Sequence, residues 1–180
     1  GDEGKGATVN WLTKTLGAGL VIRFNGGHQA GHTVELANGR GRHVFHLYGS
    51  GTFQKARTYI SRHALFNPLA EVKERRDLQS FLPGVPLLTV SPQTPIITPW
   101  DEALNQFIEH GRGPNRHGSC GVGVGEAVYR QLHKDGPKVF ASDLLVPDMT
   151  TILARELSNW FRRRVNEEAE KGSFKYLTKE

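Results

Sequence analysis

The sequence predicts an α/β domain in which a mostly parallel central sheet is flanked by helices. Apolar residues at helical spacing alternate along the chain with short apolar runs that end at glycine or proline. This alternation is typical of helices that connect parallel strands. The 180 residues are 37% hydrophobic and 23% charged, which is enough to build a hydrophobic core. We therefore expect a single domain over residues 1–180.

The first elements follow a loop, helix, strand, loop order. Val9, Leu12 and Leu16 lie at helical spacing and predict a helix over 7–16, followed by a strand over 20–24 that ends at Asn25-Gly26. Two further apolar runs, 34–36 and 44–47, flank a glycine-containing turn. They predict a hairpin.

Later elements are marked by capping residues and by periodic apolar positions. Asn67 followed by Pro68 is a typical helix start, and we expect that helix to end near Pro83-Gly84. The remaining predictions are a strand over 86–90, a helix starting at 101, a glycine-rich loop over 117–125, a short helix over 126–133, a strand over 138–141 and a long helix over 150–171.

Composition excludes several classes of protein. The net charge of +5 comes from scattered basic residues, and its densest run, Arg162 to Arg164, lies beside glutamates on an expected solvated helix face, so small anionic substrates are favoured over nucleic acid. Cys120 is the only cysteine, which excludes an internal disulfide and indicates a reducing compartment. No apolar run approaches the ~20 residues of a membrane span and no leader is visible, so we expect a cytoplasmic protein.

The first loop, GDEGKG, has the composition of a phosphate cradle. Backbone N–H groups of a glycine-rich loop that opens a helix bind phosphate oxygens, and Lys5 adds a positive charge. Gly6 stands where Ser or Thr would hold magnesium in the usual phosphate loop, which leaves Asp2 as the nearest hard ligand. Because such a loop normally follows a strand, we expect that a preceding strand is missing.

The second loop, RFNGGHQAGHT, follows a strand and carries two histidines four residues apart. His28 and His32 would converge on zinc only on a helix, and the surrounding glycines argue against a helix. A catalytic or hydrogen-bonding histidine is therefore favoured over a zinc ligand. Two ordinary loop histidines remain the alternative.

Four segments in this order, GDEGKG, RFNGGHQAGHTVEL, HLYGSGTF and GSCGVGVGEAVY, resemble the adenylosuccinate synthetase family. The resemblance covers the chain to about residue 141. It implies a phosphate-loop fold similar to P-loop NTPases, incomplete here because the first strand and the C-terminal part that binds guanine and aspartate are absent. It also implies a homodimer.

The resemblance assigns a role to each matching residue. Asp2 matches the general base that takes a proton from N1 of IMP and also ligates Mg²⁺, and His32 matches the general acid at the transferring phosphoryl group. Gly31 matches a carbonyl ligand of the metal. GTP binding is assigned to Gly1, Asp2, Glu3, Gly4, Lys5, Gly6, Gly31, His32 and Thr33. IMP binding is assigned to Asp2, Lys5, Gln29, Ala30, Gly31, His32, Cys120 and Lys134.

The implied activity is the joining of L-aspartate to IMP at the expense of GTP. Removing the N1 proton pushes charge onto O6, which then attacks the γ-phosphoryl group while His32, Lys5 and Mg²⁺ offset its charge. The amine of L-aspartate displaces the 6-phosphoryl group to give adenylosuccinate, GDP and phosphate.

Departures from the family pattern leave alternatives open. Gln29 replaces Asn, Cys120 replaces Thr, Val122 replaces Arg and Ala7 replaces Lys. The first two changes fall on the phosphate site of IMP, so an altered purine acceptor or an inactive nucleotide-binding homologue is an alternative, as is a GTPase or kinase without the ligase step. The related phage enzyme that uses a guanine deoxynucleotide has serine at the position of Asp2, which argues against it. Cys120, three residues from His117, is either a packing residue or a nucleophile.

Overall fold

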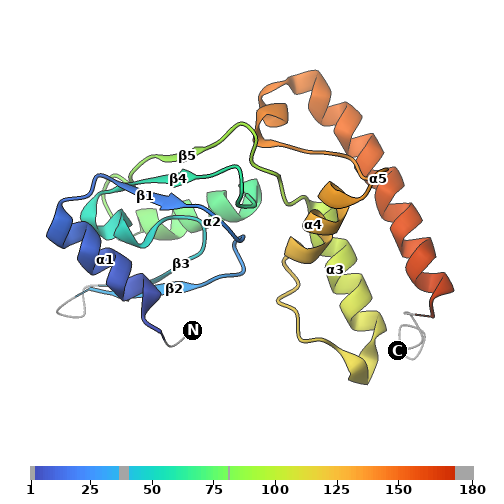
Figure 1. The fold of residues 1–180 in the computed structure, drawn as a ribbon, viewed down its shortest axis with the longest axis horizontal. Helices are drawn as coiled ribbons and strands as arrows, with labels where there is room; N and C mark the ends of the chain where they lie inside the picture. Colours follow the sequence, from blue (N-terminus) through green and yellow to red (C-terminus); the bar gives the residue numbers. More distant parts are fainter. Residues whose placement is uncertain (1–2, 37–40, 81, 173–180) are drawn as a thin grey trace. The chain divides into compact units, whose positions relative to one another are not determined.

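The computed structural model describes residues 3–36, 41–80 and 82–172. The chain forms two compact units, Gly1–Thr94 and Pro95–Glu180. The first unit contains the strands and two helices, and the second is mainly helical (Figure 1). The prediction of an α/β protein with a parallel sheet flanked by helices is confirmed.

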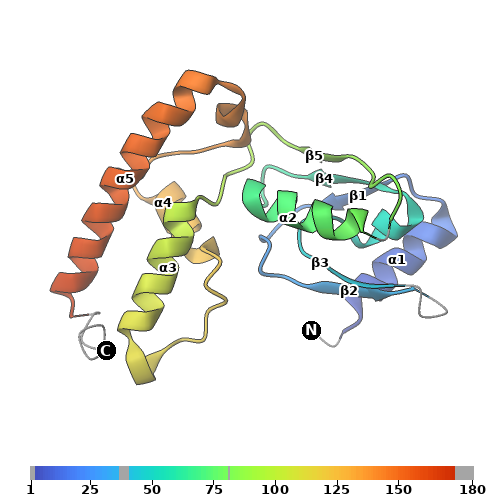
Figure 2. The same cartoon turned by 180° about the vertical axis from the view of Figure 1, so that it is seen from behind.

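The first unit is built around a parallel sheet in the order β1-β4-β5. Its strands are β1 (Leu20–Arg23), β4 (Arg57–Ile60) and β5 (Leu88–Val90). The two helices are α1 (Lys5–Leu16) and α2 (Pro68–Gln79). Helix α1 is in front in Figure 1 and α2 is in front in Figure 2, so the sheet has a helix on each side.

The predicted hairpin is present as a separate antiparallel pair. Strands β2 (His32–Glu35) and β3 (Arg42–Phe45) pair with His32 opposite Phe45. Val34 and Phe45 are both fully buried in the core of this unit. The hairpin therefore begins where the second glycine loop ends, and His32 is the first residue of β2.

Sequence reasoning missed β4, the middle strand of the sheet. Its four residues alternate between exposed Arg57, buried Thr58, partly exposed Tyr59 and buried Ile60. The strand is short and begins with a charged residue, so the apolar signal is weak even though its β-branched and aromatic residues suit a strand.

The start of α2 is confirmed and its predicted end is wrong. The Asn67 side chain accepts hydrogen bonds from the backbone N–H groups of Leu69 and Ala70, at 3.0 and 3.1 Å, and Pro68 is the first helical residue. The helix ends at Gln79, before the proline and glycine that suggested a later end. Ser80 follows it with helical dihedral angles, and its hydroxyl donates to the Asp77 carbonyl at 2.6 Å.

The second unit packs three helices on one another. They are α3 (Pro99–Gly111), α4 (Val124–Leu132) and α5 (Pro147–Glu170). Helix α3 begins two residues earlier than predicted because Thr98 and Asp101 form a capping box. The buried apolar residues include Ile97, Leu104, Ile108, Ala127, Leu153, Leu157 and Trp160.

The predicted strand over 138–141 is wrong. Phe140 makes only an isolated bridge with Pro95, and the chain then enters the 3-10 helix Ala141–Leu145. The Asp143 carboxylate accepts the Phe140 backbone N–H at 2.8 Å, while the Val139 carbonyl accepts from the Gln131 side chain at 2.9 Å. The Val139 carbonyl still accepts the Ile96 N–H at 3.0 Å, but the Phe140 N–H is occupied by the Asp143 side chain, so this backbone pairing does not extend into a strand.

The prediction that Arg162 to Arg164 form a solvated helix face is wrong for Arg164. Its side chain is buried, and it pairs with Glu126 of α4 and with Glu167 and Glu168 of its own helix. Its guanidinium also lies 4.5 Å from the centre of the Tyr129 ring. A 24-residue helix exposes one face and buries another, and position 164 is on the buried one.

In the part of the chain that the structure describes, no helix has the length and apolar content that a bilayer crossing requires.

Candidate functional site

The first glycine loop runs directly into α1. Gly4 caps the helix in the left-handed region, with φ of 66°, which favours glycine. The Lys5 ammonium donates to the Glu3 carboxylate at 2.8 Å, and this contact lowers the pKa of Glu3. Gly1 and Asp2 lie outside the described residues.

Gly6 brings this loop into backbone contact with the second loop. A Cβ at position 6 would meet the backbone of Thr33 and lie 2.8 Å from the carbonyl carbon of His32. Only glycine lets α1 approach the start of β2 this closely. The two glycine-rich segments predicted to share a ligand are thus held against each other by the fold.

The first half of the second loop, residues 25–31, is held by hydrogen bonds at two points. The Gly26 carbonyl accepts the Leu65 N–H at 2.7 Å, and Gly26 adopts a left-handed φ of 73°. Further along, Nδ1 of His46 hydrogen-bonds the His28 carbonyl at 2.9 Å. Gly26 and His28 are therefore held in place, and the loop then continues to His32, the first residue of β2.

Residues from both loops line one cavity of about 410 Å³. They are Gly4, Lys5, Gly6, Gln29, Ala30, Gly31, His32 and Thr33. Every residue of the predicted GTP and IMP sites that is both described and in the first unit is in this set, except Glu3. Glu3 lines a second cavity, of about 490 Å³, which shares Lys5, Ala30 and His32 with the first.

The second cavity contains residues to which sequence reasoning gave no role. Among its lining residues are Arg23 at the end of β1 and Ser50 at the start of the 3-10 helix Ser50–Gln54. The available signal for Arg23 was a charged residue inside the apolar run LVIRF. The glycines on both sides of Ser50 were the signal for that residue.

Burial, together with nearby positive charge, disfavours protonation of His32. Burial lowers the pKa of His32, and the nearby Arg23 and Lys5 cations and His46 lower it further. Burial also lowers the pKa of Arg23, while the negative charge of Glu74 opposes this. The resulting pocket is positive and partly desolvated, an environment that suits anionic oxygens.

Glu74 of α2 supports the segment that follows β3. Its carboxylate accepts backbone N–H groups from His46 at 2.9 Å and Leu47 at 2.7 Å, and it lies 3.4 Å from Nε2 of His43. This buried carboxylate was another residue that sequence reasoning missed. No local pattern indicates it, because its partners are about 28 residues away in the sequence.

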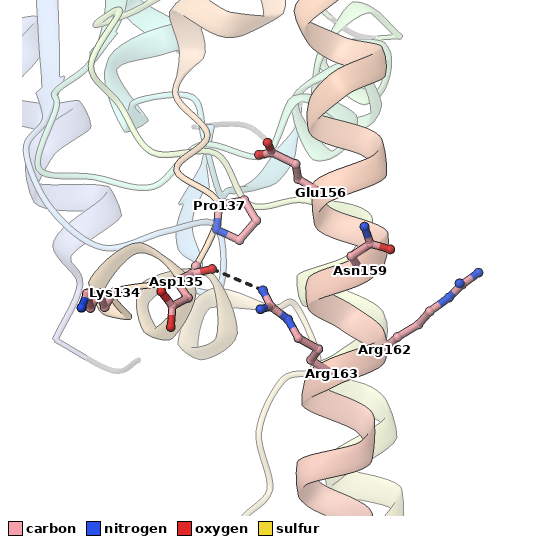
Figure 3. Close-up of a pocket in the computed structure, with 8 residues that line it drawn as sticks. Lys134, Asp135, Pro137, Glu156, Asn159, Arg162 and Arg163 are labelled. Carbon is pink, nitrogen blue, oxygen red and sulfur yellow. Dashed lines mark hydrogen bonds between the residues drawn. The ribbon is translucent and has the colours of Figure 1, made fainter.

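The remaining predicted site residues, Cys120 and Lys134, belong to the second unit. The Cys120 thiol is free and exposed, and it lines a surface pocket of about 400 Å³ with Glu109, His110 and Arg116. Lys134 lines a different pocket, of about 710 Å³, between its own loop and α5 (Figure 3).

In the pocket lined by Lys134, the basic side chains point in different directions. Arg163 donates to the Asp135 carbonyl at 3.4 Å, whereas Lys134 and Arg162 point away from one another (Figure 3). The structure therefore does not gather Lys134 with other cations into a phosphate clamp in this unit.

The described residues of the first cavity could offer a magnesium ion neutral oxygens but no carboxylate. Magnesium is usually bound by one or two carboxylates together with substrate phosphates, rather than by a cage of protein groups. Gly31, which could offer a carbonyl oxygen, and Thr33, which could offer a hydroxyl, line the cavity beside Lys5. Within residues 3–36, 41–80 and 82–172, no cluster of three or more His, Cys, Asp or Glu side chains is arranged for a metal ion.

Comparisons with known proteins agree on one family. The family model of adenylosuccinate synthetase matches residues 1–177. A curated adenylosuccinate synthetase of Xanthomonas campestris pv. campestris strain B100 is 38% identical over 159 residues. One from Xanthomonas oryzae pv. oryzae strain PXO99A is 37% identical over the same length.

The matched regions cover unequal shares of the two chains. Each alignment covers 86% of this chain and 35% of the relative. The chain therefore spans about a third of the length of the curated relatives it matches.

Two solved structures share the fold. A fully ligated adenylosuccinate synthetase from Plasmodium falciparum matches with a TM-score of 0.76 and 18% identity, over 98% of this chain and 41% of that one. A succinoaminodeoxyadenylate synthetase of cyanophage S-2L, bound to dGMP and dATP, matches with a TM-score of 0.62 and 15% identity, over 81% of this chain and 39% of that one.

Proposed function

The chain belongs to the adenylosuccinate synthetase family, and we propose that it carries the phosphate-binding and catalytic loops of a GTP-dependent ligase that joins L-aspartate to IMP. The products are adenylosuccinate, GDP and phosphate. The observation that carries this proposal is the cavity shared by the two glycine loops, which are in backbone contact at Gly6 and Thr33.

The first loop supplies the phosphate-binding groups in this proposal. Backbone N–H groups at the start of α1 and the Lys5 ammonium offset the negative charge of the GTP phosphates. The ion pair between Lys5 and Glu3 is exposed and therefore weak, so a bound phosphate can replace it as the partner of Lys5.

The reacting groups come from both loops. Asp2 takes the proton from N1 of IMP, which makes O6 the nucleophile toward the γ-phosphoryl group. His32 lies beside the same cavity as Lys5 and donates its N–H to the transferring group. The amine of L-aspartate then displaces the 6-phosphoryl group.

Asp2 and Gly31 are the proposed protein ligands of Mg²⁺. When bound, the ion supplies positive charge that stabilises the transferring phosphoryl group. We further propose that Gln29, Ala30, Cys120 and Lys134 bind IMP. We also propose that the protein acts as a homodimer in the cytoplasm, as the family resemblance implies.

The direct test is to mix the chain with GTP, IMP, L-aspartate and Mg²⁺ and to follow the formation of adenylosuccinate and the release of phosphate. We expect both products, and we expect both to disappear when L-aspartate is omitted. Asp2→Asn should abolish turnover with a smaller loss of nucleotide affinity, because the carboxylate acts mainly in the transition state. Unchanged turnover in that variant would contradict the role of Asp2.

A nucleotide-binding homologue without ligase activity is the second candidate. It is favoured by the departures Gln29, Cys120 and Val122. Intact GTP binding with no phosphate release would support it. Phosphate release that does not depend on L-aspartate would instead indicate a GTPase or kinase.

A further inference from the structure

The cavity at the end of β1 contains two buried polar groups that lack partners among the described residues. They are Nη1 of Arg23 and the Ser50 hydroxyl. Both residues line the same cavity of about 490 Å³. Buried polar groups are normally hydrogen-bonded, so two unsatisfied ones at one cavity indicate a ligand that completes them.

Arg23 is the more costly of the two to leave unpaired. A guanidinium stays charged at all ordinary pH values, and burying its charge without a partner is unfavourable. Glu74 offsets part of this charge at longer range, but no ion pair within 4.0 Å joins Arg23 to a carboxylate in the described part of the chain. The spare nitrogen is therefore available to an anion.

Ser50 is held at the cavity by the two glycines beside it. A Cβ on Gly49 would lie 2.7 Å from Cβ of Val21 in β1, and a Cβ on Gly51 would lie 2.7 Å from the Thr13 hydroxyl in α1. The Gly49 N–H donates to the Thr58 hydroxyl at 2.8 Å. This Gly-Ser-Gly turn is thus packed against the sheet and α1, and Ser50 is only 1% exposed.

We propose that Arg23 and Ser50 form an anion subsite that binds a phosphoryl oxygen of the nucleotide held by the two glycine loops. A phosphoryl oxygen is favoured over a carboxylate because Lys5 and His32 line both cavities, so the subsite adjoins the proposed phosphate cradle. This inference rests on the proposed function and adds two binding residues to it.

The test uses inorganic triphosphate as the probe, because it contains the phosphoryl oxygens without a base or sugar. Arg23→Met should weaken its binding by at least about tenfold in calorimetric titration, since hydrogen bonds to charged groups are the strong kind. Ser50→Ala should weaken binding by about two- to tenfold, as expected for a neutral hydrogen bond. Arg23→Lys should recover part of the affinity.

Arg57→Met is the matched control. Arg57 is the exposed residue of β4 that pairs with Leu20 of the neighbouring strand, so its loss changes the net charge equally. We expect unchanged triphosphate affinity for this variant. Equal weakening by Arg57→Met and Arg23→Met would overturn the subsite, because overall charge would then explain the effect.

Urea denaturation separates binding from folding. Because neither group has a partner among the described residues, Arg23→Met and Ser50→Ala should unfold at the same urea concentration as the wild type, or at a higher one. Lower stability combined with unchanged triphosphate affinity would make both residues structural and overturn the proposal. Weaker binding of L-aspartate, with triphosphate affinity retained, would overturn the phosphoryl assignment.

The anion subsite and the proposed ligase activity can be contradicted independently of each other. A wild-type chain that binds triphosphate through Arg23 but forms no adenylosuccinate would support the subsite and contradict the ligase. A chain that forms adenylosuccinate, and whose triphosphate affinity is unchanged by Arg23→Met and Ser50→Ala, would contradict the subsite alone.

Discussion

Two arginines, fully buried Arg130 and partly buried Arg23, show how differently the two units use charge. Arg130 in the second unit donates to both oxygens of Asp101 at 2.9 Å and to the carbonyls of Ile96 and Pro137. Arg23 in the first unit leaves Nη1 without a partner among the described residues and borders a cavity. A satisfied arginine holds helices and loops together, whereas an unsatisfied one beside a cavity is available to a ligand.

The largest expected effect tests whether His32, in the first unit, is a catalytic residue. His32→Ala should lower aspartate-dependent phosphate release by about 10²- to 10⁴-fold, the usual contribution of a positioned acid or base. Its free energy of unfolding should change by less than about 1 kcal/mol, since the imidazole is only half-buried. Steady-state kinetics and urea denaturation measure the two quantities.

His63→Ala is the control for this prediction, because His63 is exposed and lies outside both cavities. Comparable losses of activity in the two variants would contradict a specific role for His32.

The next effect tests whether Arg130 is structural. Arg130→Met leaves the buried Asp101 carboxylate without its cation and should lower the free energy of unfolding by about 3–5 kcal/mol in urea denaturation. Arg162→Met, on the exposed surface of α5, should change it by less than about 0.5 kcal/mol.

A double variant sharpens the result. Arg130→Met combined with Asp101→Leu should recover part of the lost stability, because no unpaired charge remains buried. A loss below about 1 kcal/mol for the single variant would contradict the comparison between Arg130 and Arg23.

A smaller effect compares a glycine from each unit. Gly6→Ala places a Cβ 2.8 Å from the carbonyl carbon of His32 and should lower the free energy of unfolding by about 1–3 kcal/mol. Gly125→Ala, in α4, meets no atom within 4 Å and should raise it by about 0.5–1 kcal/mol, because alanine suits a helix better. Thermal or urea unfolding of the two variants gives the signs, and equal signs would contradict the proposed contact between the two glycine loops.

The smallest effect is a pH dependence in the second unit. Burial raises the pKa of Glu126 above its ordinary value of 4.5, with Asp101 and Glu168 adding to the rise and Arg164 opposing it. The native state then keeps this proton to higher pH than the unfolded chain does. The Glu126 contribution to stability is therefore present at low pH and is lost as the pH rises from 4.5 through the raised value.

Glu126→Gln removes this titration. We expect the difference in unfolding free energy between wild type and variant to change across that pH interval and to be constant on either side of it. A constant difference throughout would show that the pKa of Glu126 is not raised.

Local sequence signals predicted most of the elements but not the centre of the sheet. Asn67 and Pro68 marked the start of α2 correctly because capping depends only on neighbouring residues. The hairpin and the long helix were likewise readable from their apolar spacing. Strand β4 was not, because its backbone partners come from distant parts of the chain. The false strand over 138–141 failed for a local reason, since the nearby Gln131 and Asp143 side chains hydrogen-bond its backbone.

By itself, the sequence determined the family, the two glycine loops and the residues that make them candidates for phosphate chemistry. These are properties of short motifs, in which residue type and spacing specify the backbone and the available chemical groups. Only the tertiary structure decided that Gly6 touches the start of β2 and that Arg164 is buried. It also decided that Arg23 and Ser50 line one cavity, where Nη1 of Arg23 and the Ser50 hydroxyl have no partner among the described residues. Burial and pairing depend on which remote residues pack together, and no local pattern encodes that arrangement.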